Sequence, residues 1–161
     1  MLRNLTLFIL LLLVTAACTK TTDVVDNSAA DKVTIDKYLA DNNLTDSAQF
    51  TSSGLCYIIS KPGGSYHANL KSAVLVMYRG YLTDGTVFDQ STYTYNNPTT
   101  FLLSSTTLIA GWKEGMQLVG VGGKIKLLIP SGLAYKDVAQ TLIPANSVLI
   151  FDIDLRDIYN K

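Results

Sequence analysis

The sequence contains few of the side chains that hydrolytic, redox and metal-dependent enzymes use. Its 161 residues include two cysteines, Cys18 and Cys56, and one histidine, His67. A zinc site needs several clustered His or Cys ligands, and a catalytic triad built on His67 needs a partnered nucleophile. No Gly-x-Ser-x-Gly pattern supplies that nucleophile. We therefore expect no metal site, no cofactor and no triad, and we interpret His67 as a solvated loop residue.

The chain also has no excess of charge of either sign. The chain has 13 basic and 13 acidic side chains and no long run of like charge, so nucleic acid is not an expected partner. Asp152 and Asp154 fall on the outward face of a predicted strand, where we expect solvated carboxylates rather than a hydrolytic pair. The segment 120–124, GVGGK, resembles a phosphate loop, but it leads into a strand and lacks the helix N-terminus of such a site. A tight turn is the better interpretation.

The one long apolar run lies near the N-terminus. Arg3 precedes residues 5–14, which are apolar apart from Thr6, and small residues follow up to Cys18. This layout is typical of a secretory signal, here residues 1–17, and the run is too short for a comfortable membrane span. An N-terminal anchor helix is the alternative.

The segment Thr15-Ala16-Ala17-Cys18 resembles a bacterial lipobox, with Thr15 where Leu is usual. We expect Cys18 to carry the acyl chains of a lipoprotein, which would anchor the protein in a membrane at the periplasmic face of the outer membrane. Cys56 would then be the one thiol of the mature chain. Because it lies in an apolar stretch, we expect it to be buried and inert.

The mature chain divides into three parts. Residues 18–29 are polar and predict a tether, and residues 30–53 predict a helical extension. Its helix, predicted over 30–42, has Ile35, Tyr38 and Leu39 on one face. Packing of this helix against the main domain is the preferred interpretation, and self-association is the alternative. Residues 54–161 form the main domain.

The main domain alternates apolar and polar residues with a period of two. This pattern predicts antiparallel strands with one face on a core and one facing water. A single short helix is predicted from the spacing of Leu108, Ile109, Trp112 and Met116. The fold class is therefore α+β, with an antiparallel sheet wrapped over one short helix and an extra N-terminal helix. The predicted strands cover residues 55–61, 74–79, 86–89, 101–103, 124–129 and 149–156.

Five short motifs follow one another between Val74 and Ile158. In order they are Tyr-x-Gly, Asp-Gly-x-x-Phe-Asp, Gly-Trp-x-Glu-Gly, Ile-Pro-x-x-x-Ala-Tyr and Ile-Pro, within the segments 74–91, 101–135 and 142–158. In this order they resemble the FKBP-type peptidyl-prolyl cis/trans isomerases. The resemblance implies an antiparallel sheet curled around a short helix, with a shallow apolar pocket between them.

The resemblance also implies a set of site residues. Trp112 would form the pocket floor, Tyr135 would donate a hydrogen bond to a substrate carbonyl, and Asp89 would act through Tyr78 or accept from the peptide. Leu108 and Ile109 would present backbone amides to the peptide. The implied catalytic residues are Asp89, Tyr135, Trp112 and Phe151, and the implied substrate-binding residues are Tyr78, Phe88, Leu108, Ile109 and Ile143.

The function implied by the resemblance is prolyl isomerisation that assists the folding of exported proteins. The implied partners are proline-containing peptides, unfolded exported proteins and macrolide inhibitors. Thr99 and Thr100 follow Pro98, where active members of the family often carry an aromatic residue, and the loop 136–142 lacks the usual glycines. Two alternatives therefore stay open: a lipid-anchored chaperone or peptide-binding module with weak catalysis, and a purely structural lipoprotein.

Overall fold

The computed structural model describes residues 26–91 and 97–159. The predicted signal peptide, the lipid site at Cys18 and most of the predicted tether lie outside these residues. The described elements are, in chain order, α1 (Ser28–Asp41), η1 (Thr45–Ser47), β1 (Gln49–Phe50), β2 (Cys56–Lys61), β3 (Ala73–Tyr81), β4 (Val87–Gln90), β5 (Thr99–Leu102), α2 (Ala110–Gly115), β6 (Lys124–Ile129), η3 (Ser131–Leu133) and β7 (Leu149–Tyr159).

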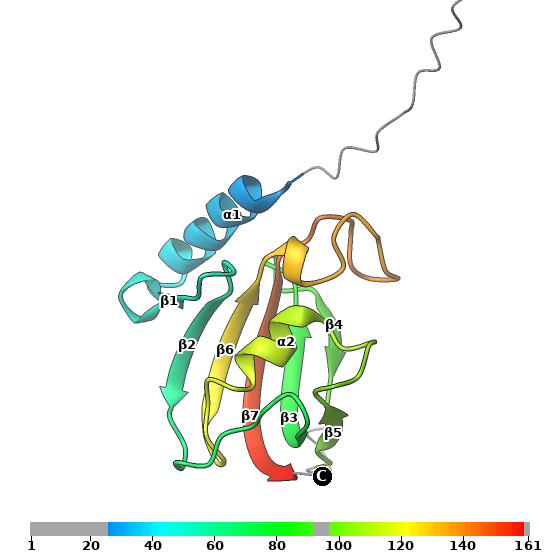
Figure 1. Ribbon diagram of the computed structural model, residues 1–161. Coiled ribbons are helices and arrows are strands. Elements are labelled where there is room, and N and C mark those ends of the chain that lie inside the picture. Colours follow the sequence, from blue (N-terminus) through cyan, green and yellow to red (C-terminus); the bar gives the residue numbers. More distant parts are fainter. Residues whose placement is uncertain (1–25, 92–96, 160–161) are drawn as a thin grey trace, which may run out of the picture.

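The strands form one antiparallel sheet in the order β1-β2-β6-β7-β3-β4, and β5 pairs with β3 beyond this path. Strand β7 lies at the centre, where Phe151 pairs with Leu127 on one side and with Gly80 on the other. The sheet curls around α2, which lies across its concave face (Figure 1). The predicted fold class, including the extra N-terminal helix, is confirmed.

The concave face holds the main core. Alternate residues of β3, β6 and β7 point toward α2, as the period of two predicts. They pack with Trp112 and Met116 from the helical segment and are nearly inaccessible to solvent. These strand residues are Val74, Val76, Tyr78, Ile125, Leu127, Ile129, Leu149, Phe151, Ile153 and Leu155.

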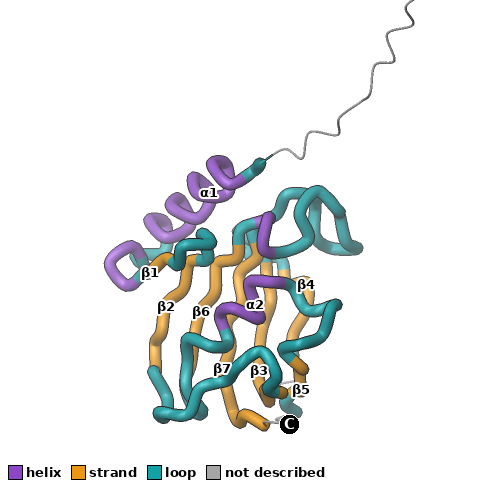
Figure 2. The backbone as a smooth tube through the Cα atoms, viewed as in Figure 1, coloured by secondary structure: helices purple, strands orange, loops and turns teal. Residues whose placement is uncertain are grey.

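Helix α1 packs on part of the opposite face of the sheet. In Figure 2 it lies beside the end of the sheet where β2 begins. Ile35 and Leu39 of this helix are 1% and 2% exposed and pack on Cys56, Leu128 and Ile150, among others. The predicted packing of the helix against the main domain is therefore confirmed. The prediction that the second face of these strands meets water is wrong here, because α1 removes Leu128 and Ile150 from solvent.

Two carboxylates on this outer face are not simply solvated, contrary to the sequence-based expectation. Asp152 is ion-paired with Lys126, and Tyr81 Oη donates a hydrogen bond to Asp152 at 3.0 Å. Asp154 is ion-paired with Lys124 and Arg156. Cross-strand pairing in the antiparallel sheet places each carboxylate beside a cation, which strand periodicity alone does not predict.

The helix α2 is shorter at its start than the apolar spacing predicts. The predicted helical set includes Leu108 and Ile109, but the helix begins at Ala110, and Ile109 has extended backbone angles with φ of −63° and ψ of 149°. Both residues therefore belong to the segment leading into the helix. Helix α1 covers Ser28–Asp41 rather than 30–42.

Candidate active site

The concave face contains a cluster of aromatic rings centred on Trp112. The indole is 2% exposed, and its centroid lies 5.4 Å from the rings of Tyr78 and Phe151, with interplanar angles of 90° and 88°. Phe101 lies 4.9 Å from the same indole. Edge-to-face contacts of this kind are favourable because the positive edge of one ring meets the negative face of another. They fix the indole as the floor of the cluster.

Two glycines allow α2 to lie this close to the sheet. A Cβ on Gly111 would come within 2.4 Å of the Ile129 side chain, and one on Gly115 within 2.5 Å of Leu127. These positions are four residues apart and therefore share one face of the helix. Any larger side chain there would lift α2, and Trp112 with it, away from β6.

Phe88 extends the ring cluster on the side of β4. Its ring meets that of Phe151 edge to face at 5.5 Å. Gly80 of β3 lies beneath both rings, since a Cβ there would come within 2.6 Å of Phe88 and 2.7 Å of Phe151. The glycine of the Tyr-x-Gly motif thus makes room for the two rings.

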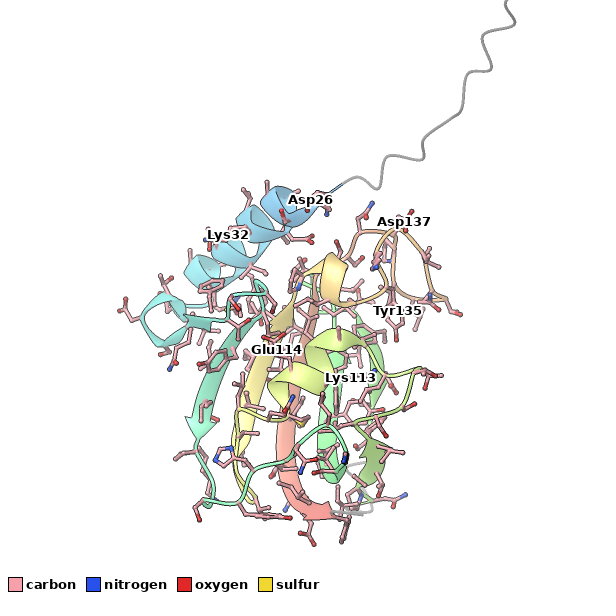
Figure 3. The ribbon with its side chains drawn as sticks, in the orientation of Figure 1. Asp26, Lys32, Lys113, Glu114, Tyr135 and Asp137 are labelled. Atoms are coloured by element: carbon pink, nitrogen blue, oxygen red, sulfur yellow. The ribbon has the colours of Figure 1, made fainter. Side chains whose placement is uncertain are left out.

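Polar groups stand at the edge of the cluster. Tyr78 Oη donates a hydrogen bond of 2.7 Å to Asp89 Oδ2. Burial and this bond to a carboxylate both raise the pKa of Tyr78, so the phenol stays protonated and acts as a donor. Tyr135 lies on the loop after η3, above α2, and is 37% exposed (Figure 3). The arrangement offers hydrogen bonding at the rim of an apolar surface.

An open pocket of about 400 Å³ lies over this floor. A pocket of that size suits a few residues of an extended peptide or a small organic ligand. Its lining comes from β4, β5, the segment before α2, α2 itself, the loop after η3 and β7. The lining residues are Asp89, Thr100, Phe101, Leu102, Ser105, Thr107, Leu108, Ile109, Trp112, Tyr135 and Phe151.

Comparisons with known proteins address the same region. The family model for FKBP-type peptidyl-prolyl cis-trans isomerase matches residues 64–156. The chain belongs to this family.

Individual relatives agree with this assignment. The FKBP-type peptidyl-prolyl cis-trans isomerase FkpA of Buchnera aphidicola subsp. Schizaphis graminum is 49% identical over 111 residues, which are 68% of this chain and 43% of that protein. The crystal structure of FkpA from Escherichia coli superposes with a TM-score of 0.72 at 37% identity, covering 86% of this chain and 62% of the other. A peptidyl-prolyl cis-trans isomerase from Pseudomonas syringae superposes with a TM-score of 0.68 at 30% identity, covering 83% and 96%. The chain spans about half the length of the curated relatives it matches.

The FKBP fold brings most of the predicted site residues together. Six of them line the pocket, and Tyr78 and Phe88 lie directly behind its walls through their contacts with Asp89 and Phe151. Ile143 is 6% exposed and packs in the main core, outside the pocket lining. The six lining residues are Asp89, Leu108, Ile109, Trp112, Tyr135 and Phe151. Their catalytic and binding roles stay predictions.

Sequence reasoning missed one side of the FKBP pocket. Thr100, Phe101 and Leu102 of β5 line it together with Ser105 and Thr107. One signal could have found them. Phe101 lies on a short predicted strand, and the loop after that strand leads directly to Leu108 and Ile109. The nearness of Phe101 in sequence to two predicted site residues is that signal.

A larger hollow of about 580 Å³ lies elsewhere, between the start of α1 and the loop after β6. Its lining contains Pro130 and Leu133 but no aromatic side chain. Of these two hollows, the smaller one alone is lined by aromatic rings and a phenol around an apolar floor. Size alone does not identify a binding site.

The remaining sequence-based candidates lie away from the pocket. Cys56 is fully buried, and burial raises the pKa of its thiol to about 12, which agrees with an inert side chain. His67 is exposed, but its Nδ1 lies 3.1 Å from the carbonyl oxygen of Gln117, so it is held against the neighbouring loop rather than free in solvent. Segment 120–124 forms a turn in which Gly122 has a φ of +77°. Neither helix in the described ranges has the length and hydropathy of a membrane-spanning segment.

Proposed function

We propose that the protein is a peptidyl-prolyl cis/trans isomerase that acts on proline-containing segments of exported proteins. The observation that carries the proposal is the convergence of six predicted side chains, from five separate parts of the chain, on one open aromatic pocket. The family match over residues 64–156 supports the same activity.

The pocket suits this reaction because no bond has to be cleaved. Rotation about an amide bond has a barrier of about 18–20 kcal/mol, since it disrupts resonance. The twisted amide has less charge separation than the planar one, so an apolar surface such as Trp112 and Phe151 favours it over the solvated ground state. Tighter binding of the twisted form lowers the barrier without a nucleophile.

The polar rim would orient the peptide. Tyr135 is partly exposed at the pocket edge and can donate a hydrogen bond to a substrate carbonyl. Asp89 already accepts from Tyr78 and keeps lone pairs free for a peptide N–H. The last residues before α2, Leu108 and Ile109, add apolar contacts to the same pocket.

We also propose that the protein is an exported lipoprotein, held through Cys18 at the periplasmic face of the outer membrane. The apolar run of residues 5–14 and the lipobox-like segment 15–18 support this location. Labelling with radioactive palmitate tests it: wild-type protein should incorporate label, and a Cys18→Ser variant should not. Equal labelling of both would refute anchoring at this cysteine.

Peptide binding with little catalysis is the alternative function. Thr100 lines the pocket at a position where an aromatic residue would have enlarged the apolar surface. Macrolide inhibitors are a further proposed ligand class, since they would fill the same apolar floor. Tryptophan fluorescence reports binding directly, because Trp112 is the one tryptophan of the chain.

The decisive experiment measures prolyl isomerisation in a short proline-containing peptide. Wild-type protein should accelerate the reaction, and Phe151→Ala should lower kcat/KM by at least about tenfold, which corresponds to about 1.4 kcal/mol of lost transition-state binding. Phe50→Ala is the matched control, because Phe50 is 44% exposed on β1 at the opposite edge of the sheet. Well-folded wild-type protein that binds the peptide without accelerating its isomerisation would leave the peptide-binding alternative.

A further inference from the structure

A carboxylate on the N-terminal helix is buried without a cation. Asp31 of α1 is 2% exposed and takes part in none of the ion pairs of the described residues. Its Oδ2 accepts hydrogen bonds from the backbone N–H of Ser131 at 2.8 Å and from Ser131 Oγ at 2.7 Å. Asn27 Nδ2 donates to its Oδ1 at 2.9 Å. Buried acidic side chains are rare unless such bonds offset their desolvation.

These bonds join α1 to Ser131, whose own hydrogen bonds hold the loop that carries Tyr135. Ser131 begins η3, and its carbonyl oxygen accepts the N–H groups of Ala134 at 3.0 Å and Lys136 at 2.9 Å. The two amides belong to the residues on either side of Tyr135. Lys136 has a φ of +57°, a left-handed conformation that non-glycine residues seldom adopt without support. Ser131 therefore holds the turn that presents the Tyr135 phenol.

The apolar side chains of α1 pack elsewhere. Ile35 and Leu39 pack on the outer face of the sheet, against residues such as Leu128 and Ile150. Figure 3 shows the start of α1, marked by Asp26, beside the loop that carries Asp137, with Tyr135 on the same loop nearer α2. The helix thus packs on the sheet through apolar side chains and bonds to Ser131 through Asp31.

We propose that Asp31 is a positioning residue for prolyl isomerisation, acting through Ser131 to hold Tyr135 at the rim of the pocket. The N-terminal helix is then a support of the active site as well as a cover for the sheet. This inference rests on the proposed isomerase activity and on the proposed hydrogen bond from Tyr135 to the substrate.

The test is a double-mutant cycle in the full chain with Asp31→Ala and Tyr135→Phe. We expect Asp31→Ala to lower kcat/KM for a proline-containing peptide by about tenfold, because the donor is displaced from the carbonyl. In the Tyr135→Phe background the same change should have almost no effect, since the phenol through which it acts is gone. A merely structural role would lower both backgrounds by the same factor, and that result would overturn the proposal.

Two further variants separate positioning from loss of folding. Ser131→Ala keeps the backbone bond to Asp31 and removes only the hydroxyl bond, so we expect a loss of about two- to fivefold with the same dependence on Tyr135. Ile35→Val weakens the apolar contact of α1 but leaves Asp31 in place, and its kcat/KM should equal that of the wild type. Amide hydrogen exchange at Ala134 and Lys136 should accelerate in Asp31→Ala and not in Ile35→Val.

The outcomes distinguish this inference from the proposed function. An inactive wild-type protein contradicts the isomerase activity itself, and the exchange rates at Ala134 and Lys136 still report whether Asp31 holds the turn. An active wild-type protein with an equally active Asp31→Ala variant contradicts only the positioning role.

Discussion

The two faces of the sheet are built from the same strands but packed differently. On the concave face, rings meet edge to face around Trp112 and leave an open pocket of about 400 Å³. On the outer face, Ile35 and Leu39 of α1 pack on Leu128 of the sheet, and all three side chains are at most 2% exposed. The comparison teaches that one sheet can carry a closed patch on one face and an open pocket beside the core on the other. The aliphatic patch beneath α1 is closed and contributes to stability, whereas the concave face holds the main core and also leaves an aromatic pocket open to a ligand.

The largest expected effect comes from truncating the closed face. Leu128→Ala should lower the free energy of unfolding by about 2–5 kcal/mol, because it leaves a cavity beneath α1. At a temperature where the variant stays folded, its isomerase rate should match the wild type. Urea unfolding and the peptide assay measure the two quantities.

Phe88→Ala on the open face is the counterpart of this variant. Phe88 is only partly buried, so its loss should cost less stability, but it supports Phe151 and should slow isomerisation. If both variants lose stability and rate in the same proportion, the two faces are not separate.

The second prediction concerns alkaline pH and the tyrosines between α1 and the sheet. Burial, first of all, raises the pKa of Tyr38 and Tyr81 from 10.0 to about 12. The folded state therefore keeps protons that the unfolded state has already lost. The contribution of these two tyrosines to the free energy of unfolding is fully present below about pH 9 and is lost as the pH rises toward 12. The thiol of Cys56, with its pKa raised from 9.0 to about 12, adds to this loss.

Urea midpoints between pH 8 and pH 11 test this dependence, in a range chosen from the unperturbed pKa of tyrosine, about 10. Tyr38→Phe should make the curve shallower, because one of the groups no longer titrates. If the urea midpoint of the wild type does not change between pH 8 and pH 11, these phenols ionise as easily in the folded protein as in the unfolded chain.

The smallest expected effect is at the solvent side of α1. Lys32 and Asp36 form an ion pair whose side chains are 58% and 51% exposed. Asp36→Asn should change the free energy of unfolding by less than about 0.5 kcal/mol, since water and salt screen such pairs. Urea unfolding at low and high salt measures it. A loss as large as that of Leu128→Ala would show that α1 is held mainly by charge.

Much of the fold could be predicted from the sequence because periodicity is local. The alternation in 124–129 and 149–156 identified two central strands, and the order of five motifs identified the residues that line most of the pocket. Which face a separate helix covers is not a local property. The burial of Leu128 beneath α1 therefore appeared only in the structure.

Contacts between distant residues were the other limit. Asp31 and Ser131 are 100 positions apart, and neither belongs to a pattern that predicts a partner. Phe101 was predicted to lie in a strand, but its place on the pocket depends on the pairing of β5 with β3. The roles of the pocket residues depend on a bound peptide, so the experiments above are needed to test them.

The position of β7 has a consequence for the order of assembly. This C-terminal strand separates β6 from β3, so the two halves of the sheet have no backbone ladder in common until residues 149–159 arrive between them. A chain exported as proposed here would have to bring residues 149–159 across the membrane before the sheet could close, so it would cross without a completed sheet. Deleting residues 149–161 should accordingly abolish cooperative unfolding, and a truncated chain that still unfolds in one sharp transition would contradict this order.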